Sequence, residues 1–165
     1  MSGPHRVWKL PAQVDTDALA PGSWMQHGID VIAQHCLESL RPDFAAGVQP
    51  GDVVVAGADF GIGSSREQAA AALRHLGVAA VIAPSFAGLF FRNAFNLGLL
   101  LLTCPGCERI AEGESITLDA ATGRVTRANG EVLQADPIPP FLLAMVQAGG
   151  LLPQLKSRFA TRTSP

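Results

Sequence analysis

The chain has 165 residues, 48% of them hydrophobic and 16% charged, which is enough apolar material for one domain with a sizeable core. Lys and Arg number 12 and Asp and Glu 14, so the net charge is −2, and no basic cluster points to nucleic acid. The longest apolar run, residues 97–103, is too short to span a bilayer, and the chain opens without an apolar signal region. We therefore expect a cytoplasmic protein with neither a nucleic-acid nor a membrane partner.

The N-terminal part of the chain predicts one strand and one helix. We expect the strand over residues 5–10, followed by a polar loop that runs through Gly22. The helix is expected over residues 30–40, with three apolar side chains facing inward: Val31, Ile32 and Leu37.

The central part of the chain predicts a strand–helix–strand–helix–strand unit. Three short apolar runs are typical of buried strands: residues 52–56, 79–83 and 99–103. The first helix is expected over residues 64–76, where the apolar residues of one face are Ala69, Ala72, Leu73 and Leu76. The second helix is expected to be capped by Ser85 and ended by Gly98, with an inward stripe of Phe86, Leu89, Phe90, Ala94 and Leu97. This alternation implies parallel neighbouring strands with right-handed crossovers.

After residue 103 the pattern changes to short strands and then helices. Three strands are expected: residues 115–118, 124–127 and 131–134. Asn129-Gly130, between the last two, is typical of a type I′ hairpin. Two closing helices, separated by a pair of glycines, are expected over residues 139–148 and 151–159, and residues 160–165 are expected to be a disordered tail. No repeat or linker divides the chain, so we expect one α/β domain over residues 1–165.

The turn between the first central strand and its helix carries the clearest functional signal. Gly61 and Gly63 permit positive φ and a close backbone approach to a ligand. Ser64 or Ser65 is a suitable N-cap, with a glutamate three residues after Ser64 to complete a capping box. Free N–H groups at the helix start, together with Arg66, would bind a carboxylate or a phosphate. A plain helix cap is the alternative, and the spacing is neither that of a phosphate-binding loop ending in Gly-Lys-Ser/Thr nor that of a dinucleotide motif.

Cys104 and Cys107 form a Cys-x-x-Cys pair, which could serve in redox chemistry or as half of a metal site. A zinc or iron–sulfur site needs three or four ligands, and the other candidates are Cys36 and four scattered histidines. An odd cysteine count without a signal region argues against a disulfide framework. We interpret the pair as structural thiols and expect no metal ligand in this chain.

Residues 61–69, Gly-Ile-Gly-Ser-Ser-Arg-Glu-Gln-Ala, resemble the signature of the swivel domain of the aconitase superfamily. Further blocks resemble, in the same order, those of the free-standing small subunits of 3-isopropylmalate dehydratases: residues 7–22, 41–52, 81–99 and 148–151. The resemblance extends from about His5 to Phe159. It implies a single swivelling β/β/α domain, like domain 4 of aconitase, with a parallel β-α-β core, a small β-hairpin region and C-terminal helices.

The resemblance also implies roles for individual residues. In that superfamily the first serine of the pair removes a proton from a substrate carbon, which corresponds to Ser64. The second serine and the arginine bind a substrate carboxylate, which corresponds to Ser65 and Arg66. Asp17 matches an acidic position that lines the site, although an Asx-type cap in its own turn is an equal alternative. The family's [4Fe–4S] cluster belongs to the large subunit, so this chain would act only with a cluster-bearing large subunit, in a heterodimer or heterotetramer.

In the same family the substrate-selecting loop follows the Pro-Gly of the opening block, and here it contains Trp24, Met25, Gln26 and His27. Trp24 and Met25 suit contact with an alkyl group of the substrate. No arginine follows them to bind a distal carboxylate. Gln26 and His27 depart from the residues usual in the family. The implied function is conversion of 2-isopropylmalate to 3-isopropylmalate by dehydration and rehydration, as in leucine biosynthesis. The alternatives are homoaconitase, methylcitramalate or dimethylmalate dehydratase small subunits, and a non-catalytic anion-binding scaffold protein.

Overall fold

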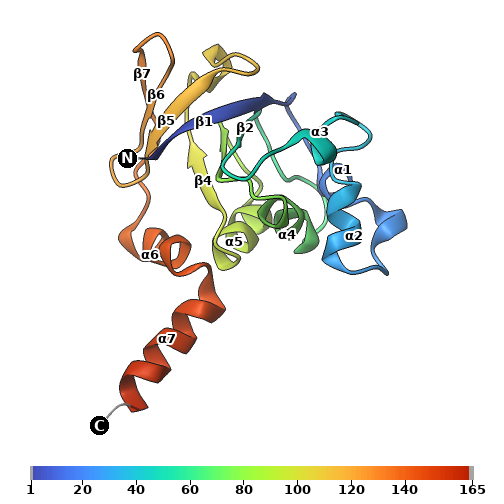
Figure 1. The fold of residues 1–165 in the computed structure, drawn as a ribbon, viewed down its shortest axis with the longest axis vertical. Helices are drawn as coiled ribbons and strands as arrows, with labels where there is room; N and C mark the ends of the chain where they lie inside the picture. The colour runs from blue at the N-terminus through green and yellow to red at the C-terminus, as the bar shows by residue number, and fades with distance from the viewer. Residues whose placement is uncertain (1, 164–165) are drawn as a thin grey trace.

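The β-branched and apolar runs of the chain pair into one seven-stranded sheet in the computed structural model, which describes residues 2–163 (Figure 1). The order of strands is β4-β3-β2-β1-β5-β6-β7. Their bounds are β1 Ser2–Lys9, β2 Val53–Val55, β3 Ala80–Ala83, β4 Leu100–Thr103, β5 Ser115–Asp119, β6 Arg124–Thr126 and β7 Val132–Gln134. β1 to β4 run parallel to one another, whereas β5 to β7 continue the sheet antiparallel from the other side of β1.

Helices connect and cover the strands. Within the described residues the helical segments are α1 Thr16–Leu19, η1 Gly22–Trp24, α2 Ile29–Gln34, α3 Phe44–Gly47, α4 Gln68–His75, α5 Gly88–Asn96, η2 Cys107–Arg109, α6 Pro140–Ala148 and α7 Leu151–Thr163. α4 packs on α1, α2 and α5, while α7 leads away from the rest of the chain (Figure 1). Across residues 2–163, none of these helices combines the length and the apolar character that crossing a membrane requires.

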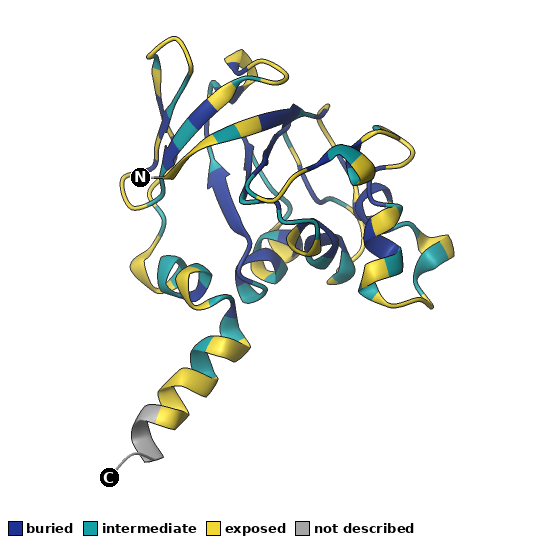
Figure 2. Cartoon of the chain, viewed as in Figure 1, coloured by how far each residue is buried: buried dark blue, intermediate teal, exposed yellow. Residues whose placement is uncertain are grey.

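The parallel half of the sheet is the strand–helix–strand–helix–strand unit that the sequence predicts. α4 joins β2 to β3 and α5 joins β3 to β4, with Val53 opposite Ala80 and Ala80 opposite Leu100. β2 and β3 are buried along their whole length (Figure 2). A parallel strand buried on both faces has no solvent side, which explains why these runs are continuously apolar rather than alternating.

The segment before β2 differs from its prediction. The expected loop through Gly22 contains α1 and the short helix η1, and the helix expected over residues 30–40 ends at Gln34. The reason is that the Leu37 N–H bonds the Ala18 carbonyl at 2.8 Å and Leu37 takes φ of +63°, which turns the chain out of the helix. Ile32 and Leu37 are buried as expected, but Val31 is only half-buried.

The start of α5 also differs. Ser85 does not cap the helix, which begins at Gly88; its hydroxyl instead accepts the Asp59 N–H at 2.9 Å. Leu89, expected in the inward stripe, is 49% exposed, whereas Phe90 and Ala94 are buried. Gly98 follows the helix with φ of +78°, as a helix-ending glycine should.

The strands and helices after residue 103 follow the prediction with two differences. Asn129-Gly130 does join β6 to β7, but only Gly130 has positive φ, whereas a type I′ turn needs it at both central positions. The closing helices break at Gly149-Gly150 as expected. α7 continues through Ala160 to Thr163, where a loose tail is expected, and residues 164–165 lie outside the described residues.

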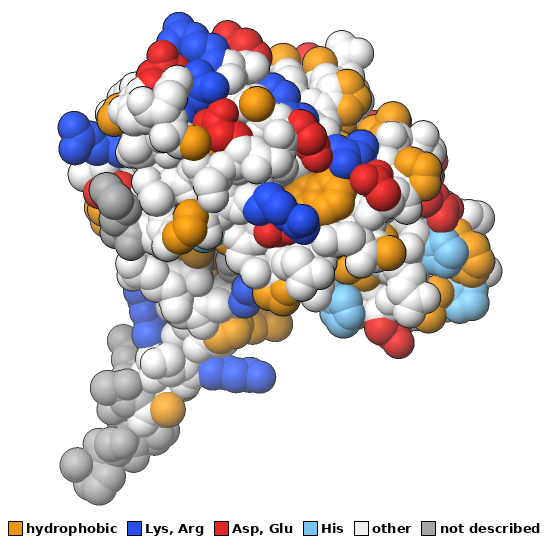
Figure 3. Space-filling view, turned by 45° about the horizontal axis from the view of Figure 1, so that its top comes forward, with side chains coloured by type: hydrophobic (Ala, Val, Ile, Leu, Met, Phe, Trp, Pro, Cys, Tyr) orange, Lys and Arg blue, Asp and Glu red, His pale blue; other side chains and the backbone are white. Residues whose placement is uncertain are grey.

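Charged side chains of both signs are interspersed on one face of the molecule (Figure 3). On the face shown in Figure 3, basic and acidic side chains lie next to one another. Several charged side chains of the described residues form ion pairs, such as Arg127 with Glu114 at 2.9 Å and Arg41 with Glu112 at 3.1 Å. This distribution agrees with the small net charge of −2.

One buried carboxylate joins β1 to the entrance of β2. Asp52 accepts hydrogen bonds from Arg6 at 2.7 Å, from Trp8 Nε1 at 2.9 Å and from the Gln49 N–H at 2.9 Å. Burial acts to raise the pKa of Asp52, but the bonds from Arg6, Gln49 and Trp8 outweigh it and hold the pKa below its ordinary value of 3.8. The charged form is therefore the one that stabilises the fold.

We predict that Asp52→Asn lowers the free energy of unfolding by about 2–3 kcal/mol, because Arg6, Trp8 Nε1 and the Gln49 N–H all donate to the one charged oxygen, Oδ2, and a neutral amide oxygen there makes weaker bonds and leaves Arg6 without its counter-charge. Since the folded pKa is depressed, this stabilisation is complete above about pH 5 and is lost as the pH falls below the ordinary value. Denaturant unfolding of both proteins across this range measures it. Asp43→Asn, at an exposed ion pair, is the control and should change stability little. A constant difference down to about pH 2 would contradict the prediction.

Candidate functional site

The site begins where two segments far apart in the sequence run side by side. The Gly61 N–H bonds the Val14 carbonyl at 2.7 Å, and the Thr16 N–H bonds the Ile62 carbonyl at 2.8 Å. The Ser64 N–H then bonds the Thr16 hydroxyl at 3.1 Å. These three bonds hold the glycine turn after β2 against the start of α1.

The two glycines of the turn are required by this packing. Gly61 and Gly63 have φ of +84° and +112°, as predicted. A Cβ at Gly61 would collide with the ring of Phe90, and one at Gly63 would lie 2.9 Å from Thr16 Oγ1. At these two positions the backbone lies too close to Phe90 and Thr16 for a side chain, so glycine is required by packing within the protein. Anion binding by this backbone stays a prediction.

The sequence predicts Ser64 or Ser65 as the N-cap of α4, but neither residue caps this helix. The helix begins four residues later than expected, at Gln68, with Glu67 as an N-cap residue that makes no side-chain cap bond. Thr16 takes the Ser64 N–H, and Asn93 Nδ2 donates to the Ser65 carbonyl at 3.1 Å, so both serines are held in a loop ahead of the helix. Both serines are exposed residues, so the loop that carries them lies on the surface of this chain.

Arg66 and Asp17 come together at the edge of this loop. Arg66 Nη1 donates to the Ala20 carbonyl at 2.7 Å and to Asp17 Oδ1 at 3.3 Å, and Asp17 Oδ1 also accepts the Gly22 N–H at 2.9 Å. The Gly22 N–H first, and then Arg66, lower the pKa of Asp17, whose side chain is 71% exposed. The N-cap of α1 is Asp15, whose side chain accepts the Ala18 N–H. The helix-capping role considered for Asp17 in the sequence analysis is therefore filled by Asp15.

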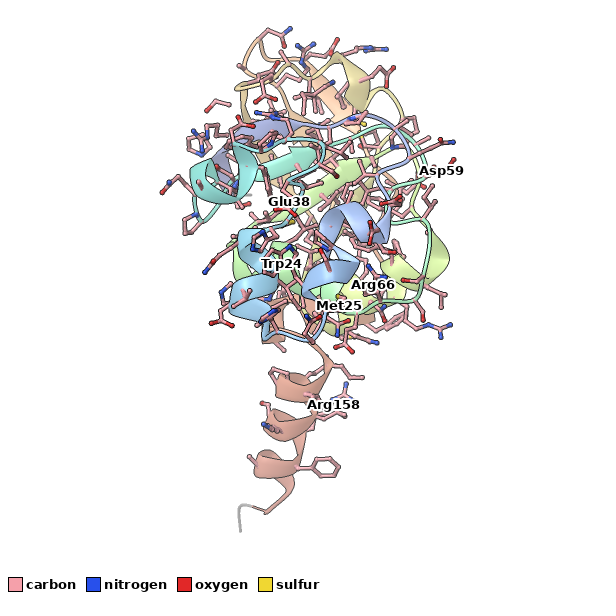
Figure 4. The ribbon with its side chains drawn as sticks, turned by 90° about the vertical axis from the view of Figure 1, so that its right-hand side faces the viewer. Trp24, Met25, Glu38, Asp59, Arg66 and Arg158 are labelled. Atoms are coloured by element: carbon pink, nitrogen blue, oxygen red, sulfur yellow. The ribbon has the colours of Figure 1, made fainter. Side chains whose placement is uncertain are left out.

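The loop expected to select the substrate starts at this pair. Asp17 connects Arg66 to Gly22, the first residue of η1, and Figure 4 shows Trp24 and Met25 on the same side of the molecule as Arg66. Trp24 and Met25 are half-buried against the core, whereas Gln26 and His27 are exposed.

Trp24 is held by a side chain that the sequence did not single out. Its ring stacks on His35 with centroids 3.7 Å apart and an interplanar angle of 6°, and His35 Nδ1 lies 2.6 Å from Glu38 Oε2. Thr16 and Asn93 were missed in the same way. Neither residue belongs to a sequence motif that indicates catalysis. Their hydrogen bonds to Ser64 and Ser65 in the folded chain identify them as part of the site.

Comparison with known proteins decides the family. Residues 43–106, which contain the serine loop and the whole parallel unit from β2 to β4, match the family model of the aconitase C-terminal domain. The chain is 45% identical over 149 residues to the 3-isopropylmalate dehydratase small subunit of Methanosarcina mazei, covering 89% of this chain and 92% of that one. It is 42% identical over 158 residues to the isopropylmalate/citramalate isomerase small subunit of Methanocaldococcus jannaschii, covering 94% of each. This chain belongs to the family of 3-isopropylmalate dehydratase small subunits.

The fold agrees with that of a solved member of the family. The crystal structure of a 3-isopropylmalate dehydratase (leuD) from Methanocaldococcus jannaschii matches with a TM-score of 0.90 and 35% identity, over 96% of both chains. The predicted family, the α/β fold and the assignment to a hydro-lyase subunit are thereby confirmed.

The cysteines of this dehydratase-family chain are buried thiols. Burial raises the pKa of Cys104 to about 11 and that of Cys107 to about 12, and it also raises the pKa of Cys36. Cys107 Sγ faces the Ala56 carbonyl at 3.7 Å. Among residues 2–163, no three His, Cys, Asp or Glu side chains gather in a way that could hold a metal ion. A protonated, buried thiol is a poor nucleophile, and the interpretation of Cys104 and Cys107 as structural thiols stays a prediction.

We predict that all three thiols react with a small thiol reagent only after unfolding, because each is buried and still protonated at about pH 8. The measurement is the number of thiols labelled in native and in denaturant-unfolded protein. Rapid labelling of Cys104 or Cys107 in the native chain would contradict the structural interpretation and point to a reactive pair.

Proposed function

We propose that this chain supplies the serine and arginine half of the active site of a hydro-lyase that converts 2-isopropylmalate to 3-isopropylmalate. The names of its relatives support this substrate class: a 3-isopropylmalate dehydratase small subunit and an isopropylmalate/citramalate isomerase small subunit. The observation that carries the proposal is the loop in which two accessible serines adjoin an arginine oriented by Asp17 and the Ala20 carbonyl. Citramalate is a second candidate substrate because the second relative's name includes it.

Arg66 is suited to bind a substrate carboxylate. Both of its hydrogen bonds to described residues leave from Nη1, so a second edge of the guanidinium can take a carboxylate in two parallel bonds. Ser65 adds an exposed hydroxyl donor beside it. Asp17 is ionised and would repel a carboxylate, so its role in binding is to orient Arg66 and to accept a hydrogen bond from a substrate hydroxyl.

Ser64 is the proposed base. Its oxygen takes a proton from the substrate carbon, the electron pair of that C–H bond forms the double bond, and the hydroxyl on the neighbouring carbon leaves. The hydroxyl leaves as hydroxide. In rehydration Ser64 returns its proton to the carbon that lost the hydroxyl, and hydroxide adds to the carbon that lost the proton. A serine oxygen can act as a base only if nearby donors and cations stabilise the alkoxide, and Arg66, two residues further along the same loop, is the cation that we propose for this role.

The chain needs a partner to complete this chemistry. The relatives are small subunits, and we propose a large subunit that pairs with this chain as a heterodimer or heterotetramer. A [4Fe–4S] cluster held by that subunit would act as the Lewis acid for the leaving hydroxyl. The buried thiols of this chain do not fit a ligand set for it. A cytoplasmic location stays a prediction.

We predict that Ser64→Ala lowers kcat of the reconstituted two-subunit complex by about 10²–10⁴-fold, the usual weight of a positioned acid–base group. The measurement is turnover of 2-isopropylmalate after anaerobic cluster reconstitution, and neither wild-type nor mutant chain should turn over substrate without the large subunit. Ser115→Ala, on β5 in the antiparallel half of the sheet, is the matched control and should keep wild-type kcat. If Ser64→Ala keeps wild-type turnover, or if the isolated wild-type chain is active, the proposed function is wrong.

We predict that the complex prefers alkyl-substituted malates to tricarboxylates such as homocitrate by about tenfold or more in kcat/KM, because Trp24 and Met25 offer apolar contact to an alkyl group. A distal carboxylate needs a cation, and no Arg or Lys lies between Lys9 and Arg41. Competition between the two substrate types in one reaction mixture measures the preference.

One variant of the loop and one control outside it serve as a matched pair for this test. Trp24→Ala should reduce the preference, and Gln34→Ala, at an exposed position of α2, should leave it unchanged. Equal or better turnover of a tricarboxylate by the wild-type complex would show that apolar contact from Trp24 and Met25 does not select the substrate.

A further inference from the structure

Thr16 is a buried hydroxyl that lies directly beside the proposed base. It is 3% exposed, and among the described residues Thr16 and Asp52 are the buried polar side chains. Asp52 is explained by its bonds to β1 and to the Gln49 N–H. Burying a hydroxyl costs free energy unless it is hydrogen-bonded. The hydrogen-bond partners of the Thr16 hydroxyl therefore indicate its role.

Both partners of the Thr16 hydroxyl are on one residue. Thr16 Oγ1 accepts the Ser64 N–H at 3.1 Å and lies 3.2 Å from Ser64 Oγ. The main chain of Thr16 is fixed independently, since its N–H bonds the Ile62 carbonyl and its carbonyl accepts the Ala20 N–H. The hydroxyl therefore approaches Ser64 from a rigid support, and Gly63 has no side chain to separate them.

The direction of the second hydrogen bond depends on the protonation of Ser64. A hydroxyl has one proton and two lone pairs, and one lone pair of Thr16 Oγ1 already accepts the Ser64 N–H. When Ser64 is protonated, either oxygen can donate. When Ser64 is an alkoxide it has no proton left, so only Thr16 can donate. A hydrogen bond to a charged oxygen is stronger than one between neutral groups, so this contact favours the reactive form.

We propose that Thr16 is a positioning residue for Ser64: its hydroxyl fixes the serine backbone through the N–H and donates its own proton to Ser64 Oγ when that oxygen is deprotonated. This inference rests on the proposed function only for the second role. The first role, holding the serine loop, follows from the hydrogen bonds of this chain alone.

Three variants in the reconstituted complex test the second role. Thr16→Val keeps the shape and removes the hydroxyl, Thr16→Ser keeps the hydroxyl, and Thr16→Val with Ser64→Ala removes both groups. We expect Thr16→Val to lower kcat about 10- to 100-fold with KM changed by about twofold or less, the loss of a hydrogen bond to a charged group. Thr16→Ser should stay within about threefold of wild type, and Thr16→Val should have no added effect once Ser64 is alanine.

The outcomes separate the inference from the proposed function. If Ser64→Ala is inactive but Thr16→Val keeps wild-type kcat, the function stands and the role of Thr16 is overturned. A Thr16→Ser variant as slow as Thr16→Val would also overturn it, because shape rather than the hydroxyl would then matter. If Ser64→Ala is fully active, the proposed function and with it the proton donation by Thr16 are both wrong.

Hydrogen exchange of the isolated full chain tests the first role without any activity. The Ser64 amide should exchange about tenfold or more faster in Thr16→Val than in wild type or Thr16→Ser, because its acceptor is gone. Thr16→Ala serves in the same way if Thr16→Val melts much lower than wild type. Unchanged exchange of the Ser64 amide in the folded variant would show that Thr16 does not hold the loop.

Discussion

The pairing of residues 14–16 with residues 61–64 is the constraint on which the site depends. Four hydrogen bonds join the segments, and two of them involve the buried Thr16 hydroxyl. This pairing decides that the serines lie in an exposed loop rather than in the first turn of α4. It also brings the end of α1 to Arg66, so the guanidinium is oriented by the Ala20 carbonyl and by Asp17. Without the pairing, a hydroxyl and a cation adjacent in sequence would have no fixed relation in space.

The sheet explains why the pairing occurs at this place. The segments that follow β1, β2 and β3 leave the same edge, the carboxyl end of the parallel strands, and two isolated bridges join them: Asp15 with Ile62 and Phe60 with Phe86. Ligand sites of open α/β sheets lie outside this edge because loops from several strands converge there. β2 is buried along its whole length, and Asp52 ties its entrance to β1, so the loop starts from a rigid base. The rigid sheet thus supplies the precision that a loop alone would lack.

The serine loop is exposed, as expected if this chain provides one half of an active site and a partner subunit provides the other. Proton abstraction from carbon and departure of a hydroxyl need a site from which bulk water is excluded, and Ser64 and Ser65 are open to solvent in this chain. A large subunit laid over this edge would cover both serines and Arg66. The loop of Trp24 lies next to the same edge, since Asp17 accepts hydrogen bonds from both the Gly22 N–H and Arg66. One carboxylate therefore connects the loop proposed to select the substrate with the arginine proposed to bind its carboxylate.

The sequence by itself determined the α/β class, the parallel unit from β2 to β4, the breaks at the glycines and the family, because apolar period, turn residues and a contiguous motif are local properties. It also placed Ser64, Ser65 and Arg66 in one turn. Only the tertiary structure decided that α4 starts at Gln68, that α2 stops at Gln34 and that Trp24 stacks on His35. In each case a backbone or ring group found a partner from another segment. Thr16, whose hydroxyl accepts the Ser64 N–H, is 48 residues away in the sequence. A local sequence pattern cannot show whether this N–H bonds a side chain of its own loop or one from a distant segment.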